Sequence, residues 1–394
     1  MSSVLEDLGI IGWDQIEPQI LTVLYLQHPL LLIGNHGTCK SDSFELLAKA
    51  ALGVNAKVAT YDTPYLQFED LIGFINPQTF NSGNEVKSTE AFVRTPFSIW
   101  DKDAILLDEL TLANPFVQGK LNELVRKRTI MGIPTNVKLV FAAVNPPDSY
   151  DTMYMPLPLA SRFAMVEVPS TKGMLQETLK KLLDFKTQPV MQPILKVLFD
   201  KADQVSVNVE ESKITNLILD IVSKIKSGGH RVSLEGRTLR TMHDLLIAFF
   251  KLKGANPDLK FKTSLDLPEV LASVIPEGFS VVNGSINRAT ILAILKDAVA
   301  NFDLNTYSLD LVEYIKAGES LDPLSFQHEC LQKIRVESRP ERLNEAMNLI
   351  QKTNLVPSII ASLLADLQTR HFLLVEGIQG NMSLQQLKTK IMGE

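Results

Sequence analysis

The chain has 394 residues, of which 45% are apolar and 21% charged, with 20 glycines and 20 prolines. This length predicts two or three domains, and the composition excludes a disordered or collagen-like protein. The net charge of -6 excludes a global attraction to nucleic acid or anionic lipid. Two cysteines cannot make a disulfide framework, the N-terminus is acidic, and every apolar stretch is shorter than the ~20 residues that cross a bilayer. We therefore expect a cytoplasmic protein that does not insert into a membrane.

The first 170 residues alternate short apolar runs with helical patterns. The runs predict buried strands, and segments between them, such as 42–52 and 114–127, place apolar residues at helical spacing. Buried strands separated by helices are typical of a parallel sheet covered on both faces. We therefore predict an α/β core with strands at 29–34, 56–61, 104–108, 138–145 and 164–168.

The pattern becomes helical from about residue 171 onward. We expect helices at 174–185, 190–202, 211–227 and 233–253, a connector with three prolines over 254–279, and further helices at 287–300, 307–316, 324–334, 339–353 and 357–368. The sequence thus predicts three parts. They are an α/β core over 1–170, a helical lid over 171–254, and a mainly helical C-terminal extension of unknown role over 255–394.

A candidate phosphate-binding loop follows the first predicted strand. Residues 34–41 match the pattern G-x-x-x-x-G-K-[ST] except at its second glycine, where this chain has Cys39. In such a loop the backbone N–H groups point at the β-phosphate, Lys40 reaches the β and γ oxygens, and the Ser41 hydroxyl binds Mg²⁺. The expected nucleotide-binding residues are Gly34, Asn35, His36, Gly37, Thr38, Cys39, Lys40 and Ser41. Because the departure falls where backbone and phosphate approach most closely, an ordinary loop stays open as the alternative.

Two acidic residues end the third predicted strand. Asp108 is expected beside the water shell of Mg²⁺, and Glu109 is expected to polarise the water that attacks the γ-phosphate. An apolar run followed by two acids also occurs at strand ends without a catalytic role, but its pairing with the loop favours a nucleotide site. Asn145 ends the next strand and could orient the water together with Glu109. His36 is expected to face solvent.

The order of these motifs resembles the AAA+ ATPases and, within them, the MoxR family. The resemblance covers roughly residues 5–250 and also rests on Ile11–Gln15, Asp70–Gly73, Leu110–Gln118, Leu121–Glu123, Ser161–Phe163 and Arg237–Thr238. It implies that Asn145 is the sensor-1 residue and that Arg162 is an arginine finger reaching the nucleotide of a neighbouring subunit. It also implies that Arg237 is a sensor-2 residue touching the γ-phosphate of its own chain, and that about 74–98 is an insertion on the ring face. Cys39 and Ser161 depart from the family pattern.

The resemblance implies a function as well as a fold. We expect a homo-hexameric, Mg²⁺-dependent ring ATPase that binds ATP and remodels or matures a partner protein in the manner of a chaperone. Proteins with a von Willebrand factor A domain are the expected class of client. Two alternatives stay open. The first is a motor on nucleic acid, which the net negative charge of the chain argues against. The second is a nucleotide-gated scaffold with little turnover, which Cys39 suggests.

The two cysteines carry different expectations. Cys39 adjoins Lys40 at the amino end of a predicted helix, where the helix dipole and a neighbouring cation favour the thiolate. One hypothesis is that its oxidation or alkylation switches ATP binding off, and the alternative is an inert, tolerated small residue. Cys330 lies in a helical pattern and is expected to be a buried, unreactive thiol.

Overall fold

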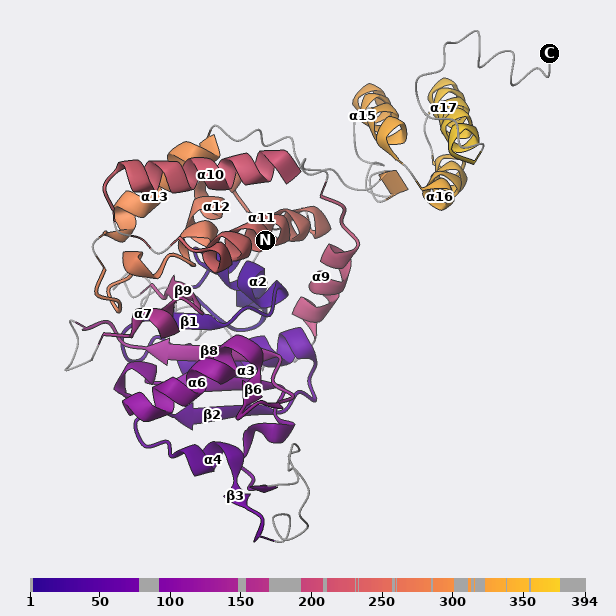
Figure 1. Cartoon of the computed structure of the whole chain (residues 1–394). Helices are drawn as coiled ribbons and strands as arrows, with labels where there is room; N and C mark the ends of the chain where they lie inside the picture. Colours follow the sequence, from indigo (N-terminus) through magenta and orange to yellow (C-terminus); the bar gives the residue numbers. More distant parts are fainter. Residues whose placement is uncertain are drawn as a thin grey trace. The chain divides into compact units, whose positions relative to one another are not determined.

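The computed structural model describes residues 3–77, 92–147, 154–169, 193–207, 211–300, 311–312, 315 and 323–375, apart from 231, 233, 257–258, 260, 285, 338 and 354–355. The chain divides into two compact units. The larger unit comprises 1–204 and 209–304, and the smaller comprises 205–208 and 305–394. The sheet lies in the larger unit, and the smaller contains the helices labelled α15, α16 and α17 (Figure 1).

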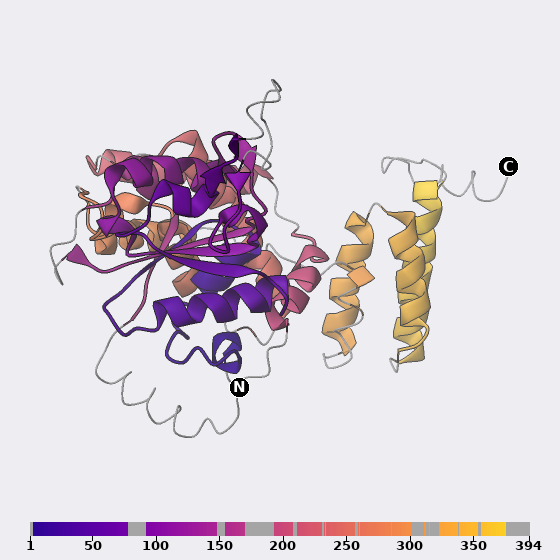
Figure 2. The same cartoon turned by 90° about the horizontal axis from the view of Figure 1, so that it is seen from below.

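A five-stranded parallel sheet forms the centre of the larger unit. Its strands are β1 (Leu30–Ile33), β2 (Val58–Asp62), β5 (Ala104–Asp108), β8 (Leu139–Val144) and β9 (Ala164–Glu167), in the order β2-β5-β8-β1-β9. Helices lie on both sides of the sheet (Figure 2), so β1 and β8 are buried along their whole length. The predicted α/β core and its five strands are confirmed.

The helices of the larger unit fall into two groups along the chain. Those of the core are α1 (Val4–Asp7), α2 (Glu17–Tyr25), α3 (Lys40–Leu52), α4 (Phe68–Ile72), α6 (Pro115–Lys127) and α7 (Leu157–Ala160), with the short 3-10 turns η2 (Ile99–Asp101) and η3 (Leu110–Leu112). The later group is α9 (Ile194–Asp203), α10 (Glu211–Ser227), α11 (Gly236–Ala255), α12 (Thr263–Ala272) and α13 (Arg288–Ala300), with η5 (Pro276–Gly278). Most of the helices predicted between 190 and 300 are confirmed, whereas 174–185 lies outside the described residues.

The region predicted as an irregular connector contains a helix, so that prediction is wrong for 263–272. Helix α12 forms although Pro268 lies inside it, where proline removes one backbone hydrogen bond and crowds the preceding turn. The helix persists because Leu267, Val270 and Leu271 are buried, and because it packs on α2, α11 and α13. Burial of an apolar face therefore outweighs local propensity here.

Residues 255–300 pack within the larger unit, and the three-part division of the chain stays a prediction.

The smaller unit has its own apolar core. Helix α17 (Pro357–Val375) packs against α15 (Pro323–Val336) and α16 (Pro340–Ile350). Cys330 is fully buried in this core beside Phe326 and Leu363, as expected for an unreactive thiol. The helix predicted at 307–316 lies almost entirely outside the described residues. Over the described chain, no helix has the length and apolarity needed to cross a membrane.

A short antiparallel strand pair stands at the base of the predicted insertion. Strand β3 (Phe74–Ile75) pairs with β4 (Phe92–Val93), and residues 78–91 between them lie outside the described part. Gly73 precedes the pair with φ at +84°, and a Cβ at this position would lie 2.2 Å from the carbonyl oxygen of Val93. Only glycine therefore allows the two ends of the insertion to meet.

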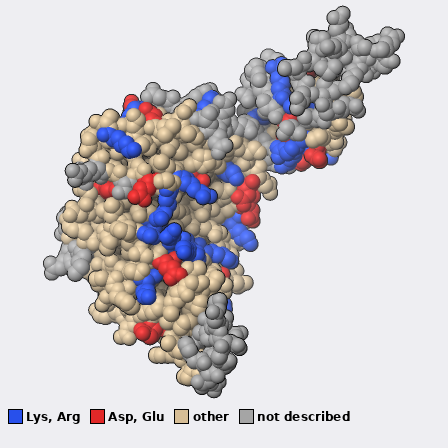
Figure 3. All heavy atoms as spheres, viewed as in Figure 1, with Lys and Arg blue, Asp and Glu red and all other residues tan. Residues whose placement is uncertain are grey.

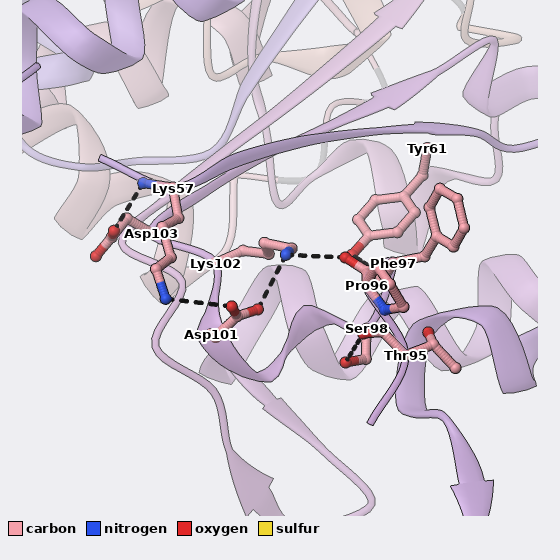
Figure 4. A network of polar contacts seen from close by, with 9 residues as sticks. All are labelled: Lys57, Tyr61, Thr95, Pro96, Phe97, Ser98, Asp101, Lys102 and Asp103. Carbon is pink, nitrogen blue, oxygen red and sulfur yellow. Dashed lines mark hydrogen bonds and ion pairs between the residues drawn. The ribbon is translucent and has the colours of Figure 1, made fainter. Parts of the chain in front are cut away.

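A polar network fixes the return of this insertion to the sheet (Figure 4). The Tyr61 hydroxyl on β2 donates to the carbonyl of Phe97 at 2.7 Å. Asp101 pairs with Lys57 at 3.3 Å and with Lys102 at 3.0 Å, which joins the start of β2 to the turn before β5. These contacts anchor the base of the insertion on the same two strands that end near the candidate site.

A second small hairpin follows α6. Strands β6 (Thr129–Ile130) and β7 (Ile133–Pro134) pair across a turn at Met131 and Gly132. Glu123 on α6 holds this turn, because its carboxylate accepts hydrogen bonds from the Thr129 hydroxyl and from the two backbone N–H groups of the turn. Glu123 therefore has a structural task, and its carboxylate is already occupied.

Candidate nucleotide site

The chain leaves β1 through a tight loop that leads directly into α3. The Gly34 N–H donates to the carbonyl of Val144 at 3.1 Å, so the loop begins beside the end of β8. A Cβ on Gly34 would lie 3.1 Å from both Thr38 and Val168, and Gly37 has φ at +76°. The two glycines thus permit a compact loop with its N–H groups near a helix N-terminus, which is what a phosphate-binding loop requires.

A pocket of 220 Å³ lies between this loop and the ends of two strands. It is lined by His36, Gly37, Thr38, Cys39, Lys40, Ser41, Asp42, Asp108, Glu109, Val144 and Asn145. Because the carboxyl ends of parallel strands meet at one edge of a sheet, residues that follow β1, β5 and β8 converge here. We call it the loop pocket. It brings together most of the site residues predicted from the sequence; the exceptions are Gly34, Asn35 and the two arginines, which are not among its lining residues.

The loop and the acidic strand end are in direct contact. The Ser41 hydroxyl donates to Asp108 Oδ2 at 2.7 Å across 67 residues of sequence, and Asp108 Oδ1 accepts the Glu109 N–H at 3.0 Å. Mg²⁺ prefers oxygen ligands and typically takes only one or two from the protein, the rest coming from phosphates and water. The hydroxyl and the carboxylate therefore fit the ion. Across the described residues, no group of three or more His, Cys, Asp or Glu could hold a metal.

Lys40 is folded back onto the loop. Its ammonium donates to the carbonyls of Gly34 at 2.7 Å and Asn35 at 2.9 Å, and it lies 3.4 Å from Asn145 Oδ1. Burial lowers the pKa of Lys40, while the carboxylates of Asp108 and Glu109 act in the opposite direction. An incoming phosphate would compete with neutral carbonyls for this ammonium, and a charged acceptor makes the stronger hydrogen bond.

Asn145 links the lysine to the loop. This side chain is 7% exposed, and its Nδ2 lies 3.1 Å from His36 Nε2. His36 is exposed, as expected, but it also contacts the end of β8, a contact that its sequence context does not predict. Glu109, which also lines the loop pocket, is half-buried and has φ at 54° and ψ at 39°, in the left-handed region that non-glycine residues rarely adopt. Such strain is common at functional sites.

Cys39 is also in the left-handed region, with φ at 57° and ψ at 27°. The expected glycine would adopt this conformation without strain, whereas a residue with a Cβ pays about 1–2 kcal/mol. The side chain is exposed and lines the loop pocket. The structure therefore places Cys39 where a ligand would meet it, and its proposed sensitivity to oxidation stays a prediction.

We expect Cys39→Gly to be more stable than Cys39→Ala by about 1 kcal/mol, because alanine keeps the Cβ and the strain whereas glycine removes both at some cost in chain entropy. Urea unfolding of the two variants measures the difference. Equal midpoints and slopes would contradict the strain at this position.

The two predicted arginines lie at the opposite edge of the sheet. A second pocket, of 490 Å³, is lined by Arg162 and Arg237 together with Leu26, Gln27, His28, Pro29, Val125, Arg126, Lys127, Arg128, Val137 and Lys138. Residues 26–29 precede β1, 137–138 precede β8, and Arg162 precedes β9, so this pocket lies at the amino ends of the strands. We call it the amino-edge pocket. Figure 3 shows Lys and Arg gathered in a band across the middle of one face of the larger unit.

Arg237 differs from its expected position. The resemblance implies that it touches the γ-phosphate of its own chain, yet it lines the amino-edge pocket with Arg162 and not the loop pocket. The packing of α11 on α2, α9 and α12 determines this position, since Arg237 is the second residue of α11. Neither arginine of one chain therefore lines the loop pocket of that chain.

Comparison with known proteins finds a family model that covers the loop. Residues 29–163 match the family described as AAA domain, dynein-related subfamily. A solved structure that matches is the 2.00 Å crystal structure of a "putative ATPase" from Cytophaga hutchinsonii ATCC 33406, with 16% identity, a TM-score of 0.48, and coverage of 84% of this chain and 92% of that chain. No curated protein matches the chain significantly.

The matched segment begins just before β1 and ends just before β9, so it includes the phosphate loop, the acidic strand end and Asn145. Residues 29–163 are thus similar to an AAA domain, a class of P-loop domain. The matched subfamily is the dynein-related one, and the MoxR resemblance stays a prediction.

Proposed function

We propose that this protein is a Mg²⁺-dependent ATPase whose copies assemble head to tail, so that each complete active site is shared by two chains. One observation carries the proposal: the loop pocket and the amino-edge pocket lie at opposite edges of the same parallel sheet. The loop pocket contains a lysine, a hydroxyl and carboxylates suited to phosphate and Mg²⁺, and the amino-edge pocket contains six cationic side chains. A contact between two different surfaces is heterologous, and it closes into a ring when the rotation between copies allows it.

Each side chain takes a separate role in this proposal. Lys40 binds the β- and γ-phosphates, Ser41 and Asp108 hold Mg²⁺, and Glu109 and Asn145 position the attacking water. Arg162 of one copy stabilises the charge that develops on the γ-phosphate held by the next copy. Arg237 acts on that same neighbouring nucleotide, because it shares a pocket with Arg162. The proposed ring has six copies, as the MoxR resemblance implies.

The proposed use of ATP is to remodel or mature a partner protein. This part rests on the MoxR resemblance and on apolar side chains at the base of the insertion. Phe74, Ile75 and Val93 are exposed there, where a protein partner could bury them. A client with a von Willebrand factor A domain is the class that the resemblance implies. A purified domain of this class that binds only Glu109→Gln protein loaded with ATP would support it.

Lys40→Ala tests nucleotide binding itself. Loss of the only lysine in the loop pocket removes a charge-assisted contact of ~1.5–3 kcal/mol, which lowers ATP affinity by more than tenfold. Titration with a fluorescent ATP analogue measures the change. Lys49→Ala is the matched control, because Lys49 lies on the same helix and, among the described residues, forms an ion pair only with Glu45. Unchanged affinity of Lys40→Ala would contradict the assignment of the loop.

A further inference from the structure

The amino-edge pocket holds more positive charge than the two expected arginines supply. Six of its lining side chains are cationic, and no carboxylate is among the lining residues. The whole chain has a net charge of -6, so this concentration opposes the overall balance. A pocket lined by one sign of charge raises the local concentration of ligands of the opposite sign. The bound class must therefore be an anion.

Some of these cations already have structural tasks. Arg128 donates to the carbonyls of Val125 and Gln27, and burial lowers its pKa to about 10. Lys138 pairs with Asp103 at 3.4 Å. Arg126 is different, because it is exposed at the end of α6 and has no hydrogen bond or ion pair to any described residue.

Arg126 lies close enough to act on the charge of the predicted finger. Burial lowers the pKa of the Arg162 guanidinium, and the charges of Arg237 and Arg126 lower it further. Within the described part of the chain, Arg162 Nε is buried and has no hydrogen-bond partner. Three guanidinium groups that repel one another, one of them incompletely bonded, gain free energy when an anion enters between them.

We infer that Arg126, Arg162 and Arg237 together form a receptor for the terminal phosphates of a nucleotide bound by the adjoining copy of the chain, with Arg126 as a third cation that the sequence motifs do not assign. This inference rests on the proposed function. Arginine suits the task because its planar fork donates two parallel hydrogen bonds to one phosphate. A third guanidinium group allows oxygens of two successive phosphates to be bound at the same time.

A polyphosphate fits this pocket better than a nucleic-acid backbone does. The cations converge from the end of α6, the residues before β8 and β9, and the start of α11 into one pocket of 490 Å³. Single strands are typically bound by a basic groove that follows the backbone and by aromatic side chains on which bases stack. None of the described residues that line the amino-edge pocket is a Phe, Tyr or Trp.

Inorganic tripolyphosphate is the probe, and Lys40→Ala is the background, so that the loop pocket does not contribute. Calorimetric titration of full-length Lys40→Ala protein should show binding, and adding Arg126→Gln should weaken it by about tenfold or more. Arg126→Lys should recover part of the affinity, because it restores the charge without the fork. Arg240→Gln, one turn along α11 and outside the pocket, is the matched control and should leave the affinity unchanged.

Three results would overturn the inference. They are no binding of tripolyphosphate by Lys40→Ala protein, equal affinity with and without Arg126→Gln in a protein of unchanged circular dichroism, and tighter binding of single-stranded DNA that Arg126→Gln abolishes. Failure of the proposed function would look different. Wild-type protein would then show no ATP hydrolysis, while the tripolyphosphate titration, which needs neither turnover nor the loop, would still report on the three arginines.

Discussion

Glu109→Gln is expected to lower the rate of ATP hydrolysis by at least ~100-fold while ATP still binds, since a positioned general base contributes ~10²–10⁴ to a rate. Glutamine keeps the size and polarity of the side chain but cannot take the proton of the attacking water. Glu109 lines the loop pocket next to Asp108, which retains its contact with Ser41. A phosphate-release assay beside a fluorescent-nucleotide titration separates turnover from binding.

Asp62→Asn is the matched control for this substitution. Asp62 ends β2 directly opposite Asp108 in the register of the sheet, so it is a carboxylate at the same edge, one strand away. It does not line the loop pocket, and its removal should leave turnover near the wild-type rate. Hydrolysis by Glu109→Gln at the wild-type rate would remove Glu109 from the mechanism.

Arg162→Ala is expected to lower turnover by ~10³-fold or more, since arginine fingers contribute ~10³–10⁵ to the rate in other P-loop enzymes. ATP affinity should stay near that of the wild type, because Arg162 lies at the opposite edge of the sheet from the loop pocket. Wild-type specific activity should also fall steeply on dilution, since an isolated chain has no neighbour to supply the arginine. Activity that is independent of protein concentration would contradict this role.

Arg240→Ala controls for loss of a surface cation from the helical group. Arg240 lies on α11 beyond the amino-edge pocket, and its removal should change neither turnover nor assembly. If Arg162→Ala instead lowered ATP affinity and turnover in equal proportion, the side chain would act on binding within its own chain.

The loop pocket could be predicted from the sequence because its parts follow strands that are recognisable by their apolar runs. In a parallel sheet the carboxyl ends of β1, β5 and β8 meet at one edge, so a loop and an acidic pair far apart in sequence come together. The hydrogen bond between Ser41 and Asp108 is the result. The phosphate-binding loop and the acidic pair are each recognisable from a few consecutive residues, so the sequence alone identifies them.

The amino-edge pocket could not be predicted in the same way. The position of Arg237 depends on how α11 packs against α2, α9 and α12, and periodicity in a helix shows which face is buried but not which element buries it. Helix α12 was missed because Pro268 is a poor local signal for a helix that long-range packing stabilises. One sequence feature could have indicated a role for Arg126, namely the basic run Arg126-Lys127-Arg128 at the end of a predicted helix.

Mixing two inactive variants tests the shared active site most directly. Lys40→Ala protein lacks a working loop but keeps its arginines, and Arg162→Ala protein keeps the loop but lacks the finger. If the site is built from two chains, mixed assemblies contain junctions in which an Arg162→Ala loop faces an intact Arg162, and phosphate release reappears on mixing. If each chain carried a complete site, the mixture would stay as inactive as its components, and the head-to-tail account would be contradicted.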